Sequence, residues 1–142
     1  MFISEWLSGE NTKIKKASFE DIQNAIKHPQ NYLLINTLSN LEQDCLILGT
    51  ILAYQEENII NEIITRVDVP DKRIIIYGRN TSDYSAEKKY NQLQKLGIPE
   101  IAIYSGGLFE WLLLQDIYGN KEFPTTKKMM DIIKYKPEKC FI

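Results

Sequence analysis

Thiols and imidazoles are the side chains best suited to nucleophilic chemistry at neutral pH, and the chain carries few of them. Cys45 and Cys140 are its two cysteines, and His28 is its single histidine. The cysteines form no CxxC pair and one histidine cannot supply a zinc cluster, so we expect neither a metal nor a cofactor. Cys45 lies in an apolar segment, where a cysteine usually serves as a small core residue. Cys140 lies in a tail that lacks the fixed surroundings that lower a thiol pKa.

The polar loop after the most β-branched run of the chain is the second place where chemistry is expected. Its residues are Gly78, Arg79, Asn80, Thr81, Ser82 and Asp83. Arg79 can bind a small anion, although a loop arginine is more often simply solvated. Asp83 can accept hydrogen bonds from the first N–H groups of the helix that follows. Its carboxylate would then fill the anion site at that helix start, and an ordinary N-cap without bearing on ligands is the alternative.

The elements that must position this loop alternate along the chain. Short apolar runs predict strands over 12–16, Tyr32–Asn36, 45–51, Arg73–Tyr77 and 100–104. Helical spacing of apolar residues predicts helices between Ser18 and Pro29 and over 56–66, 84–96 and 108–118, with a short one through 129–133. Ser18 with Asp21 is a capping signal, and Gly97 and Gly119 are suited to end two of the helices.

Strands that alternate with helices favour an α/β fold with three layers. We expect a central, mainly parallel sheet of about five strands with helices on both faces. In such sheets ligands bind beyond the carboxyl ends of the strands, which is where the loop 78–83 lies. Trp111, followed by three leucines, is expected in the core and not in a ligand site.

The stretch from about Phe19 to Trp111 resembles a rhodanese-like domain. Four segments carry the likeness, in the order that the family has them. They are 33–38, similar to a strand that ends in Asp-x-Arg; 46–51 with Gly49, similar to His-Ile-Pro-Gly-Ala; 70–77, similar to the strand before the active-site loop; and 104–111, where Gly106, Gly107 and Trp111 match Gly-Gly-x-x-x-Trp.

This resemblance implies sulfur transfer through a cysteine persulfide, held by backbone N–H groups at a helix N-terminus. In the family the cysteine usually follows the strand directly, a position that Gly78 occupies here, and a shifted alignment puts Thr81 at the centre of the loop. Neither residue is a cysteine, nor is any other residue from 77 to 84. Glycine has no nucleophile, and a threonine hydroxyl cannot form a persulfide and needs a base to act.

Two further departures from the family pattern point the same way. Asp83 stands roughly where the family often has a basic residue. Asn36 and Leu38 together replace the family's charged pair. Joint replacement is physically reasonable, because removal of one partner of a buried ion pair costs roughly 3–5 kcal/mol.

We therefore expect a catalytically inactive domain that acts as a binding or regulatory module, with another protein as its partner. The alternative is a thiosulfate or persulfide sulfurtransferase that uses Cys45 or Cys140 in place of the missing thiol. A phosphatase-like or arsenate-reductase-like activity ranks last, because it also requires the missing cysteine.

Composition narrows the remaining choices. The 142 residues carry a formal net charge of −2 with both signs interspersed, which gives no electrostatic case for nucleic acid. No apolar run approaches the roughly 18 residues of a membrane span, and we expect a soluble cytoplasmic protein. One domain is expected over 1–142, with a core of about 12–119, an amphipathic N-terminal segment 1–11 and a C-terminal extension 120–142.

Overall fold

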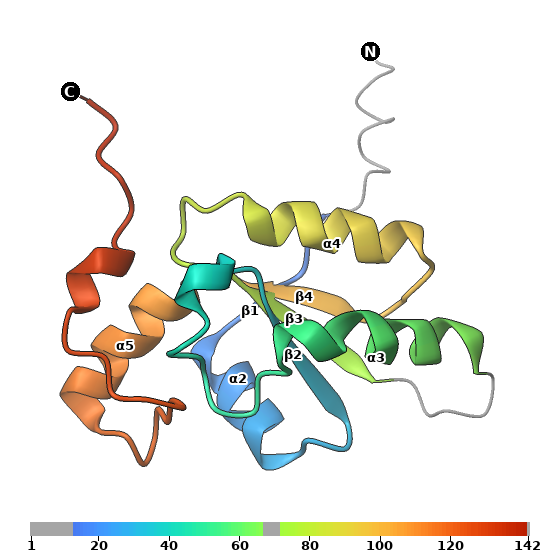
Figure 1. Ribbon diagram of the computed structural model, residues 1–142, viewed down its shortest axis with the longest axis horizontal. Coiled ribbons are helices and arrows are strands. Elements are labelled where there is room, and N and C mark those ends of the chain that lie inside the picture. Colours follow the sequence, from blue (N-terminus) through green and yellow to red (C-terminus); the bar gives the residue numbers. More distant parts are fainter. Residues whose placement is uncertain (1–12, 67–71, 142) are drawn as a thin grey trace.

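The protein is an α/β domain built around a four-stranded parallel sheet, as its computed structural model shows in Figure 1. The structure describes residues 13–66 and 72–141. The predicted amphipathic segment 1–11 lies outside these residues. The strands are β1 (Lys16–Ala17), β2 (Tyr32–Asn36), β3 (Arg73–Tyr77) and β4 (Ile101–Tyr104), in the spatial order β1-β4-β3-β2. The fold class expected from the sequence is confirmed.

Alternate residues of the central strands enter two separate hydrophobic clusters on opposite faces of the sheet. Ile74 and Ile76 of β3 belong to the second cluster, whereas Ile75 and Tyr77 belong to the first. Full burial of an isoleucine side chain stabilises the fold by about 1.5–3 kcal/mol. The period of two explains why the runs of β2 and β3 are continuously apolar, since a helix layer covers each face.

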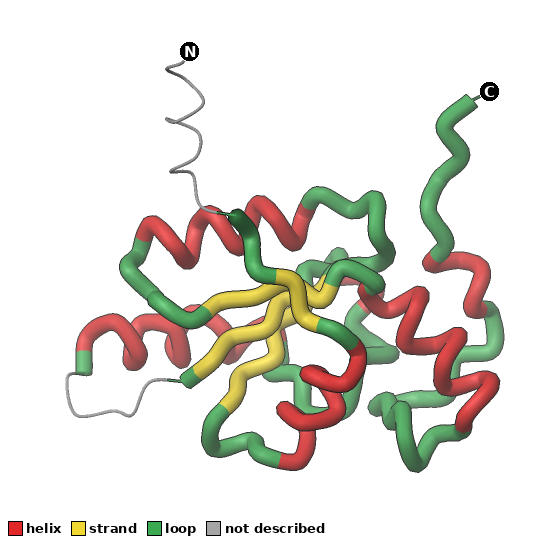
Figure 2. The backbone as a smooth tube through the Cα atoms, turned by 180° about the vertical axis from the view of Figure 1, so that it is seen from behind, coloured by secondary structure: helices red, strands yellow, loops and turns green. Residues whose placement is uncertain are grey.

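The helices that cover the two faces are α2 (Phe19–Lys27), α3 (Ala53–Thr65), α4 (Ser85–Lys95) and α5 (Gly107–Tyr118). The first cluster contains buried residues of α2 and α5, and the second contains those of α3 and α4. Figure 2 shows the strands between the helical segments. The sheet is thus the middle of three layers, and its carboxyl edge is left to loops.

Local signals set the helix boundaries. Ser18 and Asp21 form the predicted capping box, in which Ser18 Oγ accepts from Glu20 N and Asp21 Oδ2 accepts from Ser18 N at 2.8 Å. Gly97 and Gly119 follow α4 and α5 with φ of 88° and 100°. A residue with a side chain rarely adopts this backbone region, which is why glycine ends these helices.

The predicted fifth strand is not formed, so the expectation of about five strands is corrected to four in the described residues. Within 45–51 only isolated bridges occur, from Thr50 to Leu34 and from Ile47 to Thr125. Gly49, with φ of 92°, interrupts the extended backbone between these two bridges. The run is apolar because Cys45, Leu46 and Ile47 are buried in the core.

The C-terminal segment folds back onto the first cluster. The predicted helix through 129–133 is replaced by a single 3-10 turn, η2 (Ile132–Tyr135). Phe123 and Tyr135 are both buried in the first cluster. Trp111 is fully buried and donates from Nε1 to the carbonyl oxygen of Pro124 at 3.1 Å. The segment is therefore joined to α5 by both apolar and polar contacts.

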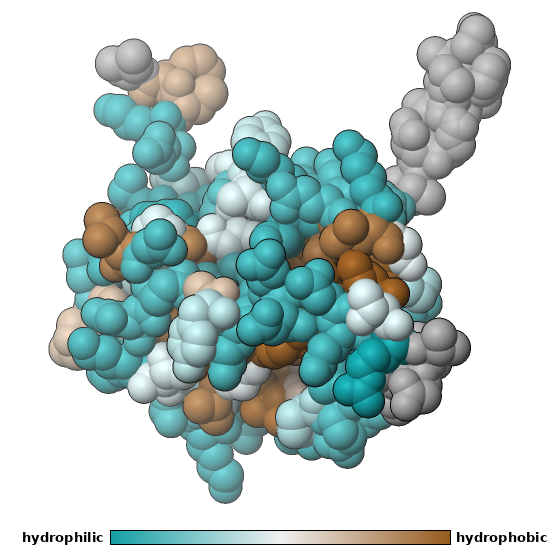
Figure 3. Space-filling model, turned by 45° about the vertical axis from the view of Figure 1, so that its right-hand side comes forward, coloured by the Kyte–Doolittle hydropathy of each residue, from teal (hydrophilic) through white to brown (hydrophobic). Residues whose placement is uncertain are grey.

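None of the helices in residues 13–66 and 72–141 is long and apolar enough to cross a membrane. Figure 3 shows one face of the molecule, which is mostly hydrophilic with separate hydrophobic patches.

Candidate functional site

The loop 78–83 begins where β3 ends and leads into α4. Gly78 follows Tyr77 directly and is buried. The first turn of α5 holds the start of the loop through two backbone hydrogen bonds. Leu108 N donates to Gly78 O at 2.9 Å, and Phe109 N donates to Arg79 O at 2.8 Å. Gly107 makes this approach feasible: its φ is 67°, and a methyl group on its Cα would lie 2.7 Å from Gly78 O. The loop is thus packed directly against the Gly-Gly turn.

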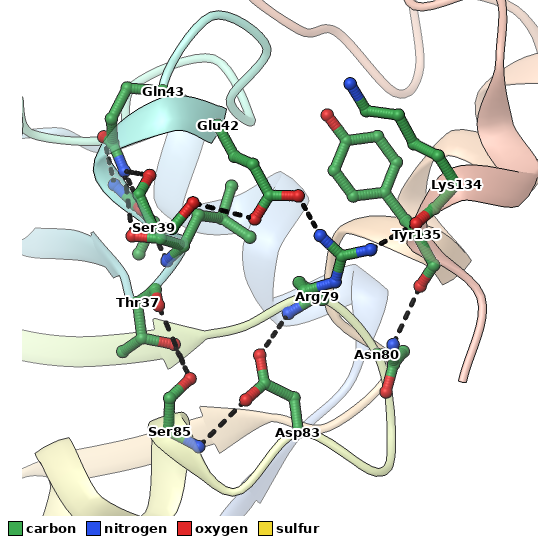
Figure 4. A network of polar contacts seen from close by, with 12 residues as sticks. Thr37, Ser39, Glu42, Gln43, Arg79, Asn80, Asp83, Ser85, Lys134 and Tyr135 are labelled. Atoms are coloured by element: carbon green, nitrogen blue, oxygen red, sulfur yellow. Dashed lines mark hydrogen bonds and ion pairs between the residues drawn. The ribbon is translucent and has the colours of Figure 1, made fainter. Parts of the chain in front are cut away.

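The carboxylate of Asp83 points back into the loop (Figure 4). Its Oδ2 accepts from Arg79 N at 2.9 Å, and its Oδ1 accepts from Ser85 N at 3.0 Å. A methyl group on the Cα of Gly78 would lie 2.6 Å from Asp83 Oδ2 and 3.1 Å from Thr37 Oγ1. The carboxylate therefore takes the volume that any side chain at position 78 would need.

Asp83 bonds to the first helical N–H of α4, as the sequence predicts, but Tyr84 is the cap residue and makes no side-chain cap bond. Partial burial acts to raise the pKa of the Asp83 carboxyl. The hydrogen bonds from Arg79 N and from Ser85, together with the nearby Arg79 charge, outweigh burial and hold this pKa below its usual value. Asp83 is accordingly a stable anion inside the loop.

Arg79 joins three segments that are far apart in the sequence. Its guanidinium forms an ion pair with Glu42 of η1 (Asn40–Glu42) and donates to the carbonyl oxygen of Lys134 in η2. Its Cζ lies 5.2 Å from the centre of the Tyr135 ring, in a cation–π contact. Figure 4 shows Glu42 and the η2 backbone converging on this one side chain.

Asn80 completes the attachment of the loop to the C-terminal segment. Its Nδ2 donates to Tyr135 O at 2.8 Å, and its Oδ1 accepts from Ser82 N at 2.9 Å. Sequence reasoning missed Glu42, Lys134 and Tyr135. No local pattern marks them, because their partners lie 37 and 55 residues away in the chain. Thr81 and Ser82 are exposed at the tip of the loop.

Asn36 and Leu38, the residues compared above with a charged pair, belong to a neutral network. Asn36 is buried, and its Oδ1 accepts from Leu38 N at 3.0 Å and from Gln43 Nε2 at 2.9 Å. Asn36 Nδ2 in turn donates to Gln43 Oε1 at 3.2 Å. Two amides that satisfy each other avoid the cost of a buried unpaired charge. Gln43 is a fourth residue that the sequence alone did not indicate.

The two cysteines are placed very differently. Cys45 is fully buried, and its thiol donates to Lys127 O at 3.3 Å. Burial raises the pKa of the Cys45 thiol, which reduces the thiolate fraction at neutral pH. Cys140 is exposed in the C-terminal segment. The three atoms nearest to the side-chain position of Gly78 belong to Asp83 and Thr37, so neither sulfur is among them.

Within residues 13–66 and 72–141, no three or more His, Cys, Asp or Glu side chains gather in a way that suits a metal ion. The charged groups of the loop itself are the Asp83 carboxylate and the Arg79 guanidinium.

A family model for the rhodanese-like domain matches residues 18–114, which is more than half of the chain. The chain belongs to the rhodanese-like domain family. The match covers β2, β3, β4 and the whole candidate loop. A search of curated proteins found no match for this rhodanese-like domain.

Solved structures share the fold at low sequence identity. The BH2092 protein from Bacillus halodurans is 17% identical with a TM-score of 0.56, over 94% of this chain and 98% of that one. A single-domain sulfurtransferase, RDL2 from Saccharomyces cerevisiae, is 19% identical with a TM-score of 0.54, over 75% and 95%. A Lactobacillus plantarum protein is 18% identical with a TM-score of 0.55, over 78% and 91%. These likenesses show the fold of this rhodanese-like domain.

Proposed function

We propose that this rhodanese-like domain is not a sulfurtransferase and that it acts as a binding or regulatory module. The observation that carries the proposal is that the Asp83 carboxylate occupies the space beside Gly78 where a side chain at position 78 would lie. Position 78 has no side chain, and the Asp83 carboxylate fills the space where one would lie, 2.6 Å from the Cβ position. A persulfide anion and this carboxylate would compete for the same backbone N–H group of Arg79.

The alternative enzyme would need another thiol, and the positions of Cys45 and Cys140 count against it. Cys45 is buried with a raised thiol pKa, and its hydrogen bond goes to the C-terminal segment. Cys140 is exposed and lies outside the loop. Efficient thiol chemistry needs a thiolate in a fixed, partly exposed site that favours the anion. The described contacts of Cys45 and Cys140 supply no such site.

A thiosulfate:cyanide sulfurtransfer assay on the full chain tests the proposal, with the Cys45→Ser and Cys140→Ser variants alongside. The yeast single-domain sulfurtransferase is a suitable positive control. We expect no thiocyanate formation above the protein-free rate. Clear turnover that disappears in one of the two variants would establish the enzyme and end the binding-module proposal.

A gain-of-function experiment tests whether the Asp83 carboxylate blocks a side chain at position 78. Gly78→Cys alone should carry no labile sulfane sulfur, because its Cβ meets the Asp83 carboxylate. Gly78→Cys combined with Asp83→Ser removes this obstacle and frees the amide of Arg79. We expect sulfane sulfur after thiosulfate treatment in the double variant only. Equal loading of the single variant would show that Asp83 does not block the site.

The partner that we propose is another protein, docked on the face that carries the closed loop. The segments joined to the loop carry exposed apolar side chains: Leu41 of η1 at 94%, Tyr84 directly after the loop at 79% and Ile133 of η2 at 64%. We propose one domain over the chain and a cytoplasmic location, which the free thiols of Cys45 and Cys140 support.

A further inference from the structure

The C-terminal turn η2 is held against the candidate loop by a small number of polar contacts. Arg79 and Asn80 donate to the carbonyl oxygens of Lys134 and Tyr135, which are consecutive residues. Tyr135 is buried, whereas its neighbours Lys134 and Lys136 are exposed. The buried Tyr135 ring belongs to the first cluster and Ile132 packs against it, whereas the polar attachment to the loop depends on two side chains of the candidate site.

The guanidinium of Arg79 is the group in this attachment for which an external ligand can compete. The Arg79 side chain remains 31% exposed, so a small solute can reach it. One of its acceptors is a neutral carbonyl, that of Lys134. A tetrahedral oxyanion is a stronger acceptor, because charge-assisted and bidentate hydrogen bonds to guanidinium exceed those to a neutral carbonyl.

The Asp83 carboxylate already occupies the backbone N–H group of Arg79, so the Arg79 side chain is the cationic group of the loop 78–83 that an incoming anion would meet. Arg79 N is already used by Asp83, and Ser82 N is used by Asn80. An anion that approaches the loop therefore pairs with the side chain of Arg79 and not with these amides. Pairing there would compete with the bond that the guanidinium donates to Lys134 O and with its contact with the Tyr135 ring.

We infer that Arg79 is an anion-responsive clamp: a small tetrahedral oxyanion such as phosphate binds its guanidinium and releases η2 from the loop. This rests on the proposed function, since a sulfurtransferase would need the loop for its own substrate. The coupling is reciprocal, so a chain whose η2 is already detached binds the anion more tightly. The site thereby converts the concentration of an oxyanion into exposure of the C-terminal segment.

The rate of limited digestion with trypsin measures the release of η2 directly at the residue that Arg79 contacts. Cleavage after Lys134 breaks the peptide bond whose carbonyl oxygen Arg79 holds. The full chain is digested in inorganic phosphate and in sodium chloride of equal ionic strength, and the products are followed by mass spectrometry. A chromogenic substrate in the same buffers corrects for any effect on trypsin. We expect cleavage after Lys134 to be at least about fivefold faster in phosphate.

Two arginine variants make the test specific. Arg79→Gln should be cut rapidly in both buffers, because the clamp is absent. Arg73→Gln changes the arginine at the other end of β3 and should keep the full phosphate response. Asn80→Ala removes the bonds to Tyr135 O and from Ser82 N but leaves Arg79 in place, so its basal cleavage should rise while the phosphate response persists. Asn80→Ala also keeps the test valid if Arg79→Gln does not fold.

Unchanged or slower cleavage of the wild-type chain in phosphate would overturn the inference, as would an Arg79→Gln variant that responds like the wild type. These failures leave the sulfurtransfer result untouched. Conversely, turnover in the sulfurtransfer assay would remove the proposed function whatever the digestion shows.

Discussion

Arg73 is the first residue of β3 and Arg79 lies in the loop just after its last, and the two side chains have opposite surroundings. Arg79 pairs with Glu42, holds the carbonyl of Lys134 and stacks on Tyr135. The Arg73 side chain is exposed and donates a hydrogen bond to Tyr32 Oη at 3.3 Å. Cavities of about 320 and 420 Å³ open beside Arg73, both lined by Arg73 and Tyr32.

The difference shows that specific polar contacts of this domain are concentrated at the carboxyl end of the strands, around Arg79. In parallel α/β sheets the carboxyl end of the strands is the ligand end. Here that end is filled by side chains and carbonyls of the chain itself, while the amino end is left open. The closed state of the loop is therefore built from specific contacts with η1, α5 and η2.

The largest loss of stability is expected when Gly78, beside the Asp83 carboxylate, is given a side chain. Gly78→Ala places a methyl group 2.6 Å from Asp83 Oδ2, so the carboxylate must leave its two N–H donors. We expect a loss of roughly 2–3 kcal/mol in the free energy of unfolding, measured with denaturant. In the Gly78→Ala, Asp83→Ser double variant the loss should fall short of the sum of the two single losses. Strict additivity would contradict the proposed contact.

The matched arginine pair gives the next largest effect. Arg79→Ala leaves Glu42 without its partner and removes the bond to Lys134, so the free energy of unfolding should fall by about 1–2 kcal/mol. Arg73→Ala should leave it unchanged, because the side chain is exposed. Equal effects of the two substitutions would mean that the clamp contributes nothing beyond an ordinary surface arginine.

The smallest expected effect is a pH dependence that belongs to Asp83. Its folded-state pKa is depressed, so its stabilisation is fully present above the unfolded-state pKa of roughly 3.9. The stabilisation is lost as the pH falls through the lower folded-state pKa. The difference in unfolding free energy between the wild type and Asp83→Asn should thus be constant near neutral pH and shrink below about pH 4. A difference that persists in strong acid would show that the charge is not the cause.

Features that depend on neighbouring residues could be predicted from the sequence. The runs of β2 and β3 and the capping box of α2 carry their information within a few residues. The glycines after α4 and α5 do the same through their positive φ. The location of the candidate loop followed, because its place at the end of β3 is a property of the strand alone.

Features that depend on distant partners could not be predicted. The run 45–51 has the composition of a strand, but its burial comes from contacts with the C-terminal segment, such as Leu46 N to Thr126 Oγ1 at 3.0 Å. The spacing of 129–133 suits a helix, yet only the turn η2 forms, and its last two carbonyl oxygens accept from Arg79 and Asn80. In both cases long-range contacts outweigh local propensity.

The surroundings of Trp111 make the C-terminal segment visible to spectroscopy. Its indole is fully buried, edge-on to Tyr104 and Phe123 and bonded to Pro124 O. Rings in a fixed asymmetric array give a near-ultraviolet circular dichroism signal that disappears when tight packing is lost. The domain therefore contains an intrinsic optical reporter for the attachment of residues 123–124, which needs no label once Trp6 is replaced by phenylalanine.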